Sequence, residues 1–201
     1  MKFILAKKVG MTRVFGEDGR VRAGTVLKTD GVTVTQVKTA DGKDKYSAVQ
    51  VGFGARRTKN ISKAVLGHTK GAGFETIREF RGAQGELGAK IDTSTFAVGD
   101  VVTVSGLTKG KGFAGVVKRH GFHGGRRTHG QKHSEREPGS IGGSGGRAGG
   151  RVAKGIRMAG RMGADRVAVK NLKVLAVSGN EIIVSGAVPG NRGTILEVVA
   201  A

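Results

Sequence analysis

The sequence predicts a mainly β protein: an antiparallel β-barrel body with a long, basic, glycine-rich loop extension. Three observations lead to this class. Short apolar runs that alternate at period two recur near both ends of the chain, Asp-Gly pairs separate the first of these runs, and residues 109–166 combine high positive charge with few apolar residues. Alternation indicates half-buried strands, and Asp-Gly is typical of tight hairpins between antiparallel strands. At about 100–200 residues per domain, the length allows one domain or two small ones.

The N-terminal 108 residues supply the first predicted elements. Strands are expected over 32–35, 49–53 and 101–104, where valines alternate with polar residues or form a short apolar run. The Asp-Gly pairs stand at 18–19, 30–31 and 41–42. Two short helices are also expected, one capped by Asn60 and running through Leu66, the other over residues 75–81.

The C-terminal residues supply the remaining strands. Valines over 167–177 precede a turn at 178–180, and apolar runs follow at 182–184 and 195–198. Thirty-five residues are too few for a sheet domain of their own, so we expect them to complete the barrel begun before residue 108. The predicted organisation is therefore a body formed by residues 1–108 and 167–201, with residues 109–166 as an extension anchored at both ends.

The charge of the chain is concentrated in that extension. The protein has 35 Lys and Arg against 15 Asp and Glu, a formal charge of +20, and residues 109–166 hold 14 of the basic and only 3 of the acidic residues. The same segment has 17 of the 37 glycines and few apolar side chains. Burial there cannot offset a backbone ordering cost of about 1–2 kcal/mol per residue. We expect the segment to be disordered alone and to become ordered on a polyanion.

Cations and glycines alternate along this segment in a way that suits nucleic acid. Arginine outnumbers lysine nine to five, and its planar guanidinium binds phosphate bidentately and stacks on bases. Glycine lets the backbone approach phosphates closely. The alternative of an idle solvated linker gains nothing from such self-repulsion. The expected nucleic-acid contacts here are Lys109, Lys111, Lys118, Arg119, Arg126, Arg127, His129, Lys132, Arg136, Arg147, Arg151, Lys154, Arg157, Arg161 and Arg166.

Several other site types are disfavoured. Residues 110–115 match a dinucleotide-binding pattern with Glu135 placed as the ribose acid, but glycines after His120 break the helix that this pattern needs. Four histidines lie at 120–133, yet a dense cationic field opposes a metal ion, so no metal site and no cofactor are expected. The carboxylates are scattered and no serine pairs with a histidine and an acid, so we do not expect an enzyme or a small-molecule substrate.

The sequence also lacks cysteine, and its longest apolar runs are four residues. These features exclude disulfides and thiolate chemistry and predict neither a membrane span nor a signal peptide. A soluble, cytoplasmic, polyanion-binding protein is therefore expected.

Five motifs, in order along the chain, resemble one known family. They are Lys7 to Phe15, Thr108 to Arg119, Pro138 to Gly142, Met158 to Gly163, and Gly186 to Gly190. Together they are similar to the universal large-subunit ribosomal protein three family (the L-three proteins) in its bacterial form. The resemblance extends over essentially the whole chain.

This resemblance implies a translation-factor-like barrel and a loop that threads through 23S rRNA toward the peptidyl-transferase centre. It implies direct rRNA binding, a part in nucleating subunit assembly, and contacts with neighbouring large-subunit proteins. Lys7, Lys8 and Arg13 of the first motif join the expected rRNA contacts. The innermost turn would comprise Gly142, Gly143, Ser144, Gly145, Gly146, Arg147, Ala148, Gly149, Gly150 and Arg151.

One departure from the family pattern concerns that turn. Gly143 stands where many bacterial members have a glutamine that is methylated in some of them, so we do not expect that modification here. The functional prediction is a non-enzymatic component of the large ribosomal subunit. The alternative is a general nucleic-acid-compacting protein, although no helix-turn-helix, finger or zipper pattern is present.

Overall fold

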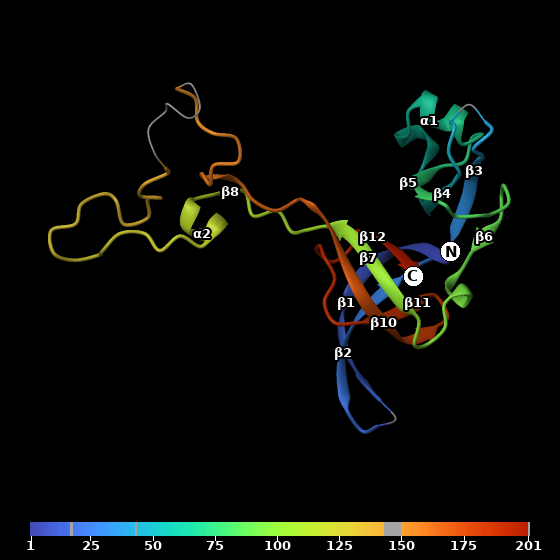
Figure 1. Cartoon of the computed structure of the whole chain (residues 1–201). Coiled ribbons are helices and arrows are strands. Elements are labelled where there is room, and N and C mark those ends of the chain that lie inside the picture. Colours follow the sequence, from blue (N-terminus) through green and yellow to red (C-terminus); the bar gives the residue numbers. More distant parts are fainter. Residues whose placement is uncertain (17, 43, 143–149, 201) are drawn as a thin grey trace. The chain divides into compact units, whose positions relative to one another are not determined.

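The computed structural model describes residues 1–16, 18–42, 44–142 and 150–200. The chain forms two compact units, which we call the barrel unit (residues 1–108 and 166–201) and the arm unit (residues 109–165). Antiparallel strands dominate the described structure and its helices are short, which confirms the predicted mainly β class (Figure 1).

Six strands of the barrel unit form a closed antiparallel barrel. Their order is β1-β12-β7-β10-β11-β2, and β2 pairs back onto β1. The bounds are β1 Phe3–Phe15, β2 Val21–Lys28, β7 Val101–Leu107, β10 Arg166–Ser178, β11 Glu181–Ser185 and β12 Ile195–Ala200. Each of the last three strands pairs with a strand from the first 108 residues. The barrel therefore combines strands from both ends of the chain.

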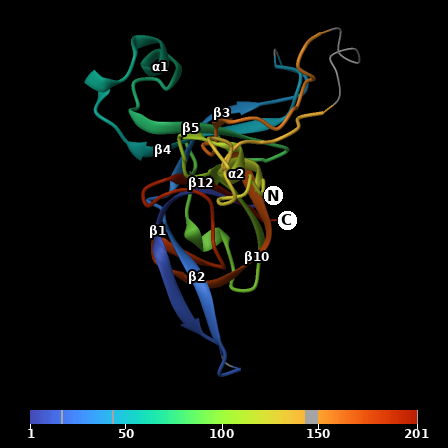
Figure 2. The same cartoon turned by 90° about the vertical axis from the view of Figure 1, so that its left-hand side faces the viewer.

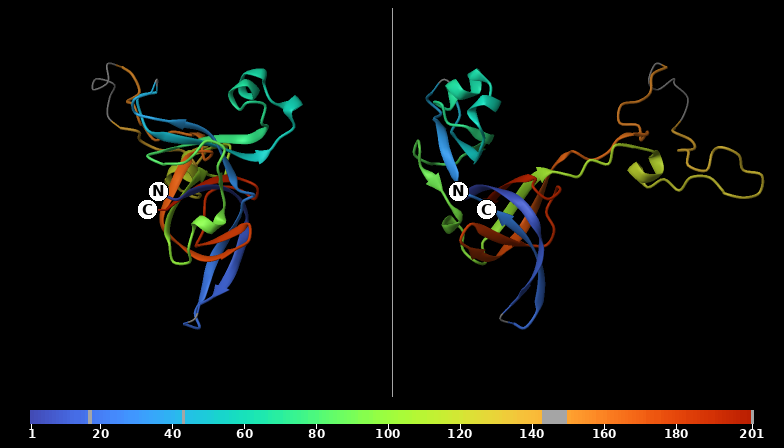
Figure 3. Two further views of the ribbon diagram at one scale, coloured as in Figure 1. Left: turned by 90° about the vertical axis from the view of Figure 1, so that its right-hand side faces the viewer. Right: turned by 180° about the vertical axis from the view of Figure 1, so that it is seen from behind.

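Along the barrel strands, side chains alternate between the buried interior and the outer surface. In β12, Leu196, Val198 and Ala200 are buried while the residues between them are partly exposed. The two chain ends meet at one strand pair, where the Ala200 N–H donates to the Lys2 carbonyl at 2.9 Å, and both views of Figure 3 show the termini side by side. Pairing of the ends closes the barrel without leaving an edge strand exposed there.

A second sheet of four strands belongs to the same unit. It has the order β5-β4-β3-β6, with bounds β3 Val32–Lys38, β4 Ala48–Ala55, β5 Phe74–Arg81 and β6 Lys90–Ile91, and the short helix η2 Thr93–Thr95 follows it. Figure 2 shows β3, β4 and β5 running across one end of the barrel. Phe3 of β1 stacks on Phe80 of β5, with ring centroids 4.5 Å apart, and both belong to one continuous hydrophobic cluster. The sheet and the barrel therefore share a core.

The prediction of a helix over residues 75–81 is wrong, because these residues belong to strand β5. It pairs with β4 over its whole length. Two of its charged side chains form ion pairs with strands of the barrel: Glu75 Oε2 lies 2.6 Å from Lys7 Nζ on β1, and Arg78 Nε lies 3.2 Å from Glu197 Oε1 on β12. These long-range contacts, together with the burial of Phe80, override the local preference for helix.

The helix expected from Asn60 through Leu66 is displaced along the chain. Residues Thr58–Asn60 form the short helix η1, and α1 runs from Lys63 to His68. Ser62 is its N-cap, and its Oγ accepts from the Val65 N–H at 3.4 Å. A serine hydroxyl satisfies one of the free N–H groups of the first turn, which fixes the start of the helix two residues later than expected.

The arm unit has little regular structure. It contains β8 (Phe113–Ala114), α2 (Val116–His120) and β9 (Gly160–Arg161). Ala114 and Val116 are its buried hydrophobic side chains among the described residues, and neither belongs to the hydrophobic cluster of the barrel unit. The described arm is therefore shaped by backbone hydrogen bonds and glycine turns rather than by a core.

Candidate nucleic-acid interface

The base of the arm is a short antiparallel clamp. β8 pairs with β9 through Phe113–Arg161 and Ala114–Gly160. The pairing continues outside these strands, where the Lys111 N–H donates to the Met162 carbonyl at 2.9 Å and the Met162 N–H donates to the Gly112 carbonyl at 3.0 Å. Two segments fifty residues apart in sequence are thus held together, and Lys111 and Arg161 lie exposed on them.

Gly163 lets the two segments of the clamp come this close. Its φ is +76°, and a Cβ built there would lie 2.1 Å from the Lys109 carbonyl oxygen. A side chain at this position would have to push the backbone of residue 109 away. The site therefore requires glycine on both conformational and steric grounds.

Helix α2 is fastened to the clamp through Arg119. Its Nη1 donates to the Met158 carbonyl at 2.8 Å, and His120 Nε2 lies 3.1 Å from the same oxygen. The guanidinium also passes directly beside the Gly160 backbone. Arg119 is partly buried, and this contact gives it a positioning role that its residue type alone does not reveal.

Residues 121–142 form an open loop beyond the helix. Arg127 Nε lies 2.7 Å from Glu135 Oε1, and the Gly125 N–H donates to the Glu135 carbonyl at 2.9 Å. Glu135 thus pairs with a cation of its own loop instead of presenting a ribose-binding acid. β8 has two residues and α2 has five, so residues 110–115 do not open the long helix that a dinucleotide site needs.

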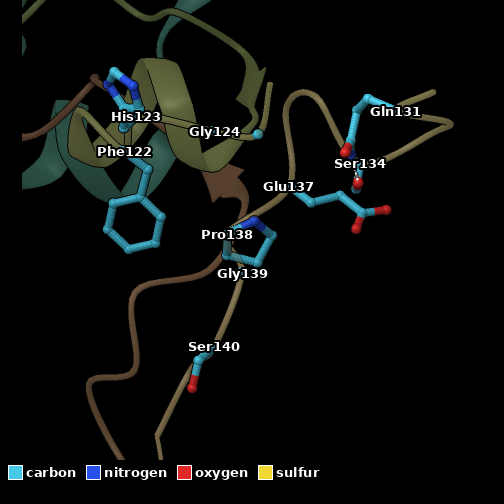
Figure 4. Close-up of a pocket in the computed structure, with 10 residues that line it drawn as sticks. Phe122, His123, Gly124, Gln131, Ser134, Glu137, Pro138, Gly139 and Ser140 are labelled. Atoms are coloured by element: carbon cyan, nitrogen blue, oxygen red, sulfur yellow. Dashed lines mark hydrogen bonds between the residues drawn. The ribbon is translucent and has the colours of Figure 1, made fainter. Parts of the chain in front are cut away.

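A shallow hollow lies inside this loop, with a cavity volume of about 540 Å³. Figure 4 shows Phe122, Pro138 and Ser140 along it, with Gln131 hydrogen-bonded to Ser134 at its rim. The His123 imidazole and the Glu137 carboxylate also line the hollow, and in Figure 4 these two side chains point away from each other. In the described part of the chain no three His, Asp or Glu side chains gather as metal ligands, and no helix is long and apolar enough to cross a membrane.

The predicted arm cations are turned outward. Twelve of them lie in the described part of the arm unit, and all but Arg119 are exposed. The described arm contains one ion pair between its own residues, Arg127–Glu135. The exposed cations are Lys109, Lys111, Lys118, Arg126, Arg127, Lys132, Arg136, Arg151, Lys154, Arg157 and Arg161. His129 is exposed as well, with a φ of +60°.

Three of the four predicted contacts in the barrel unit have partners within that unit. Lys7 pairs with Glu75, and Lys8 Nζ donates to the carbonyls of residues 188 and 190 at 2.7 and 3.0 Å. Arg166 forms a two-point ion pair with Glu197. Arg13 is exposed on β1.

The innermost turn is described only at its ends. Gly142, with a φ of +126°, Gly150 and Arg151 are described. The predicted residues Gly143, Ser144, Gly145, Gly146, Arg147, Ala148 and Gly149 lie outside the described residues.

Sequence reasoning did not single out a second group of exposed cations between β4 and β5. Five basic residues and no acidic residue occur from residue 56 to residue 73. Counting charge over the whole N-terminal block conceals this run, because acidic residues elsewhere in the block balance it. A count in windows of about twenty residues would have found it.

Comparison with known proteins identifies relatives along the whole chain. Residues 87–181 match a family model described as Ribosomal protein L3. The chain is 44% identical over 209 residues to the large ribosomal subunit protein uL3 of Chlorobium phaeobacteroides, an alignment that covers 100% of this chain and 99% of that protein. It is 46% identical to the uL3 protein of Cutibacterium acnes, covering 100% of this chain and 92% of that protein. The uL3 protein of Herpetosiphon aurantiacus is 44% identical, covering 98% and 95%.

Proposed function

The chain belongs to the ribosomal protein L3 family, whose members are non-enzymatic structural components of the large ribosomal subunit, and we propose that it binds 23S rRNA directly through its arm unit. The bacterial large subunit works in the cytoplasm, so that is where the chain acts. The observation that carries the proposal is the combination of eleven exposed arm cations with one ion pair among the described arm residues.

Charge neutralisation is the physical basis of this binding. Exposed cations at close spacing repel one another and gain free energy when RNA phosphates lie between them. Each phosphate contact releases a counterion, so affinity falls with salt at a logarithmic slope of about 0.7–0.9 per contact. Arginines add bidentate phosphate contacts and stacking on unpaired bases.

The clamp and the loop have different parts in this proposal. The clamp holds Lys111, Arg161 and the α2 cations in fixed relation at the base, where rRNA would first be bound. The loop beyond it would then follow the RNA inward, and residues 142–151 would form its innermost turn toward the peptidyl-transferase centre. Binding of RNA by both parts would help to nucleate subunit assembly next to neighbouring large-subunit proteins.

Sedimentation of a cell lysate tests the proposal at the level of the subunit. The protein should travel with large subunits and stay there through a moderate-salt wash. If instead it sediments with chromosomal DNA, it is a nucleic-acid-compacting protein and the proposal is wrong.

Chemical probing of rRNA tests the placement of the innermost turn. Subunits assembled with the double variant Arg147→Ala, Arg151→Ala should show changed reactivity near the catalytic centre, with unchanged reactivity at the barrel's docking site. Unchanged reactivity near the centre would place the turn elsewhere.

A further inference from the structure

The segment between β4 and β5, residues 56–73, forms a lobe that we call the cationic lobe. All five of its basic residues are exposed, and none forms an ion pair with a carboxylate in the described residues. They are Arg56, Arg57, Lys59, Lys63 and Lys70. Elsewhere in the barrel unit, by contrast, many cations are paired, as Lys2 is with Asp100 and Lys38 is with Glu79.

The lobe is built by its own hydrogen bonds. The Arg56 N–H donates to the Gly73 carbonyl at 3.0 Å and closes its base. The Thr69 hydroxyl is within reach of the carbonyls of Val65 at 3.0 Å and Ala72 at 2.6 Å, and Thr69 is 7% exposed. The cations therefore project from a preformed scaffold, whereas most arm cations lie on irregular backbone.

Lys70 stands at a position where helices prefer glycine. Helix α1 ends in the paired hydrogen bonds of a Schellman motif: the Gly71 N–H donates to the Leu66 carbonyl at 2.8 Å and the Lys70 N–H to the Gly67 carbonyl at 3.4 Å. The residue between the cap and Gly71 must be left-handed, and Lys70 has a φ of +53°. A β-carbon is unfavourable in the left-handed conformation, so glycine would be the less strained residue here. A lysine at this position is explained if its positive charge is needed for binding.

We propose that the cationic lobe is a second RNA-binding surface, which holds the phosphate backbone of large-subunit rRNA independently of the arm. The inference rests on the proposed function in taking rRNA as the polyanion. An acidic protein is the other conceivable partner, but stable protein interfaces are centred on apolar or aromatic anchors. Val65, at 38% exposure, is the one large apolar side chain of the lobe that is exposed. A cationic surface without an apolar centre fits phosphate.

Filter binding of the full-length protein to a transcript of bacterial 23S rRNA, across a salt series, tests this surface. The lobe variant carries Arg56→Gln, Arg57→Gln, Lys59→Gln, Lys63→Gln and Lys70→Gly. The control variant removes the same charge from exposed barrel-unit lysines that form no ion pair with a described carboxylate: Lys28→Gln, Lys45→Gly, Lys90→Gln, Lys170→Gln and Lys173→Gln. Thermal unfolding of both variants verifies that they fold.

The lobe variant should lose about 5–8-fold in affinity at 0.1 M salt for each phosphate contact removed, with a salt slope lower by about 0.7–0.9 per contact. The control variant should stay within a few-fold of the unaltered protein. Equal losses in both variants would show a general charge effect and overturn the inference. Unaltered RNA binding with poor incorporation into subunits would show that a protein docks on the lobe, and would also overturn it.

A single substitution separates charge from folding. Lys70→Gly relieves the left-handed strain and removes one cation, so it should leave thermal stability unchanged or raised while weakening RNA binding about 5–8-fold. Lys45→Gly is its matched control, because Lys45 also has a positive φ, +58°, but sits in a loop with Asp41 and Asp44. Equal RNA binding by the two variants would count against the lobe. Failure of the unaltered protein to bind the transcript would overturn the proposed function and this inference together.

Discussion

The barrel unit and the arm unit differ in how many hydrophobic side chains they bury and in how many of their cations form ion pairs. Twenty-five hydrophobic side chains are buried in the described structure, and only Ala114 and Val116 of them belong to the arm. In the barrel unit, ion pairs such as Arg166–Glu197 and Lys7–Glu75 balance cations internally. In the described arm, by contrast, twelve cations are present and one ion pair, Arg127–Glu135, joins residues of the arm. The buried core therefore lies almost entirely in the barrel unit, while the described arm carries a large excess of positive charge.

Because of this difference, we expect the barrel unit to determine the unfolding free energy and the arm unit to determine the affinity for RNA. Full burial of one Val, Leu, Ile or Phe side chain contributes about 1.5–3 kcal/mol. Among the described residues, all buried side chains of these four types except Val116 are in the barrel unit. Under the proposed function, neutralisation of RNA phosphates supplies the corresponding free energy for the arm. Changes in one unit should therefore move one property and leave the other nearly unaltered.

Deletion of residues 122–156 should show this separation with the largest effect. It removes seven cations, so affinity for 23S rRNA at 0.2 M salt should fall at least about 1,000-fold. The barrel unit should unfold at the same temperature as in the complete chain, because no residue of its hydrophobic cluster is lost. A deletion variant that does not fold would show that the arm belongs to the core.

Leu5→Ala should produce the converse result. Leu5 is fully buried in β1, and a truncation of this kind costs about 2–5 kcal/mol of unfolding free energy. Urea denaturation measures this cost. Val116→Ala in the arm is the control, and it should leave the main unfolding transition in place. A comparable loss in both variants would mean that the two units unfold as one.

Gly163→Ala should weaken RNA binding without changing charge. A left-handed alanine costs about 1–2 kcal/mol, before the clash with the Lys109 carbonyl is counted. About tenfold weaker binding with an unchanged salt slope is expected in filter binding. Gly110→Ala is the matched control, since nothing lies within 4 Å of a Cβ built there. If both variants bind like the unaltered chain, the geometry of the clamp does not matter for binding.

Acid should affect the barrel unit through Asp100, and this is the smallest effect. The Ala97 N–H at 3.0 Å and then the Lys2 ammonium at 2.9 Å hold the pKa of the Asp100 carboxyl below its ordinary value. Because the folded-state pKa is lowered, this stabilisation is present above the unfolded pKa of about 3.9 and is lost as pH falls through the folded value. Urea midpoints at pH 6 and pH 3 should differ less in Asp100→Asn than in the unaltered chain. An equal difference between the two midpoints in the variant and in the unaltered chain would show that Asp100 does not contribute to the pH dependence of stability.

Strands were predicted correctly where the local sequence itself shows alternation of apolar and polar residues or a turn. Val32 and Val34 alternate with threonine, and the turn at 178–180 separates β10 from β11 as expected. Strand β5 was mistaken for a helix, because the partners of Glu75 and Arg78 lie on β1 and β12, far away in sequence. The separate four-stranded sheet was missed for the same reason, since alternation does not tell which strands pair.

The candidate site was predictable in its charge but not in its geometry. The spacing of Lys and Arg between glycines is visible in the sequence, and so is the scarcity of carboxylates. That Arg119 bonds to the Met158 carbonyl is not visible, because the contact joins residues 39 positions apart. The run of lobe cations is visible in the sequence when charge is counted in short windows, but the absence of ion-pair partners among the described residues is visible only in the folded chain.

Amide hydrogen exchange, compared between the free protein and the large subunit, tests the central difference between the two units most directly. In the free protein, amides of β1, β7 and β12 should exchange slowly and those of residues 121–142 and 150–158 quickly, and only in the subunit should the second group become protected. If those arm amides are as well protected in the free protein as the barrel strands, the arm has a stable structure of its own and does not depend on RNA.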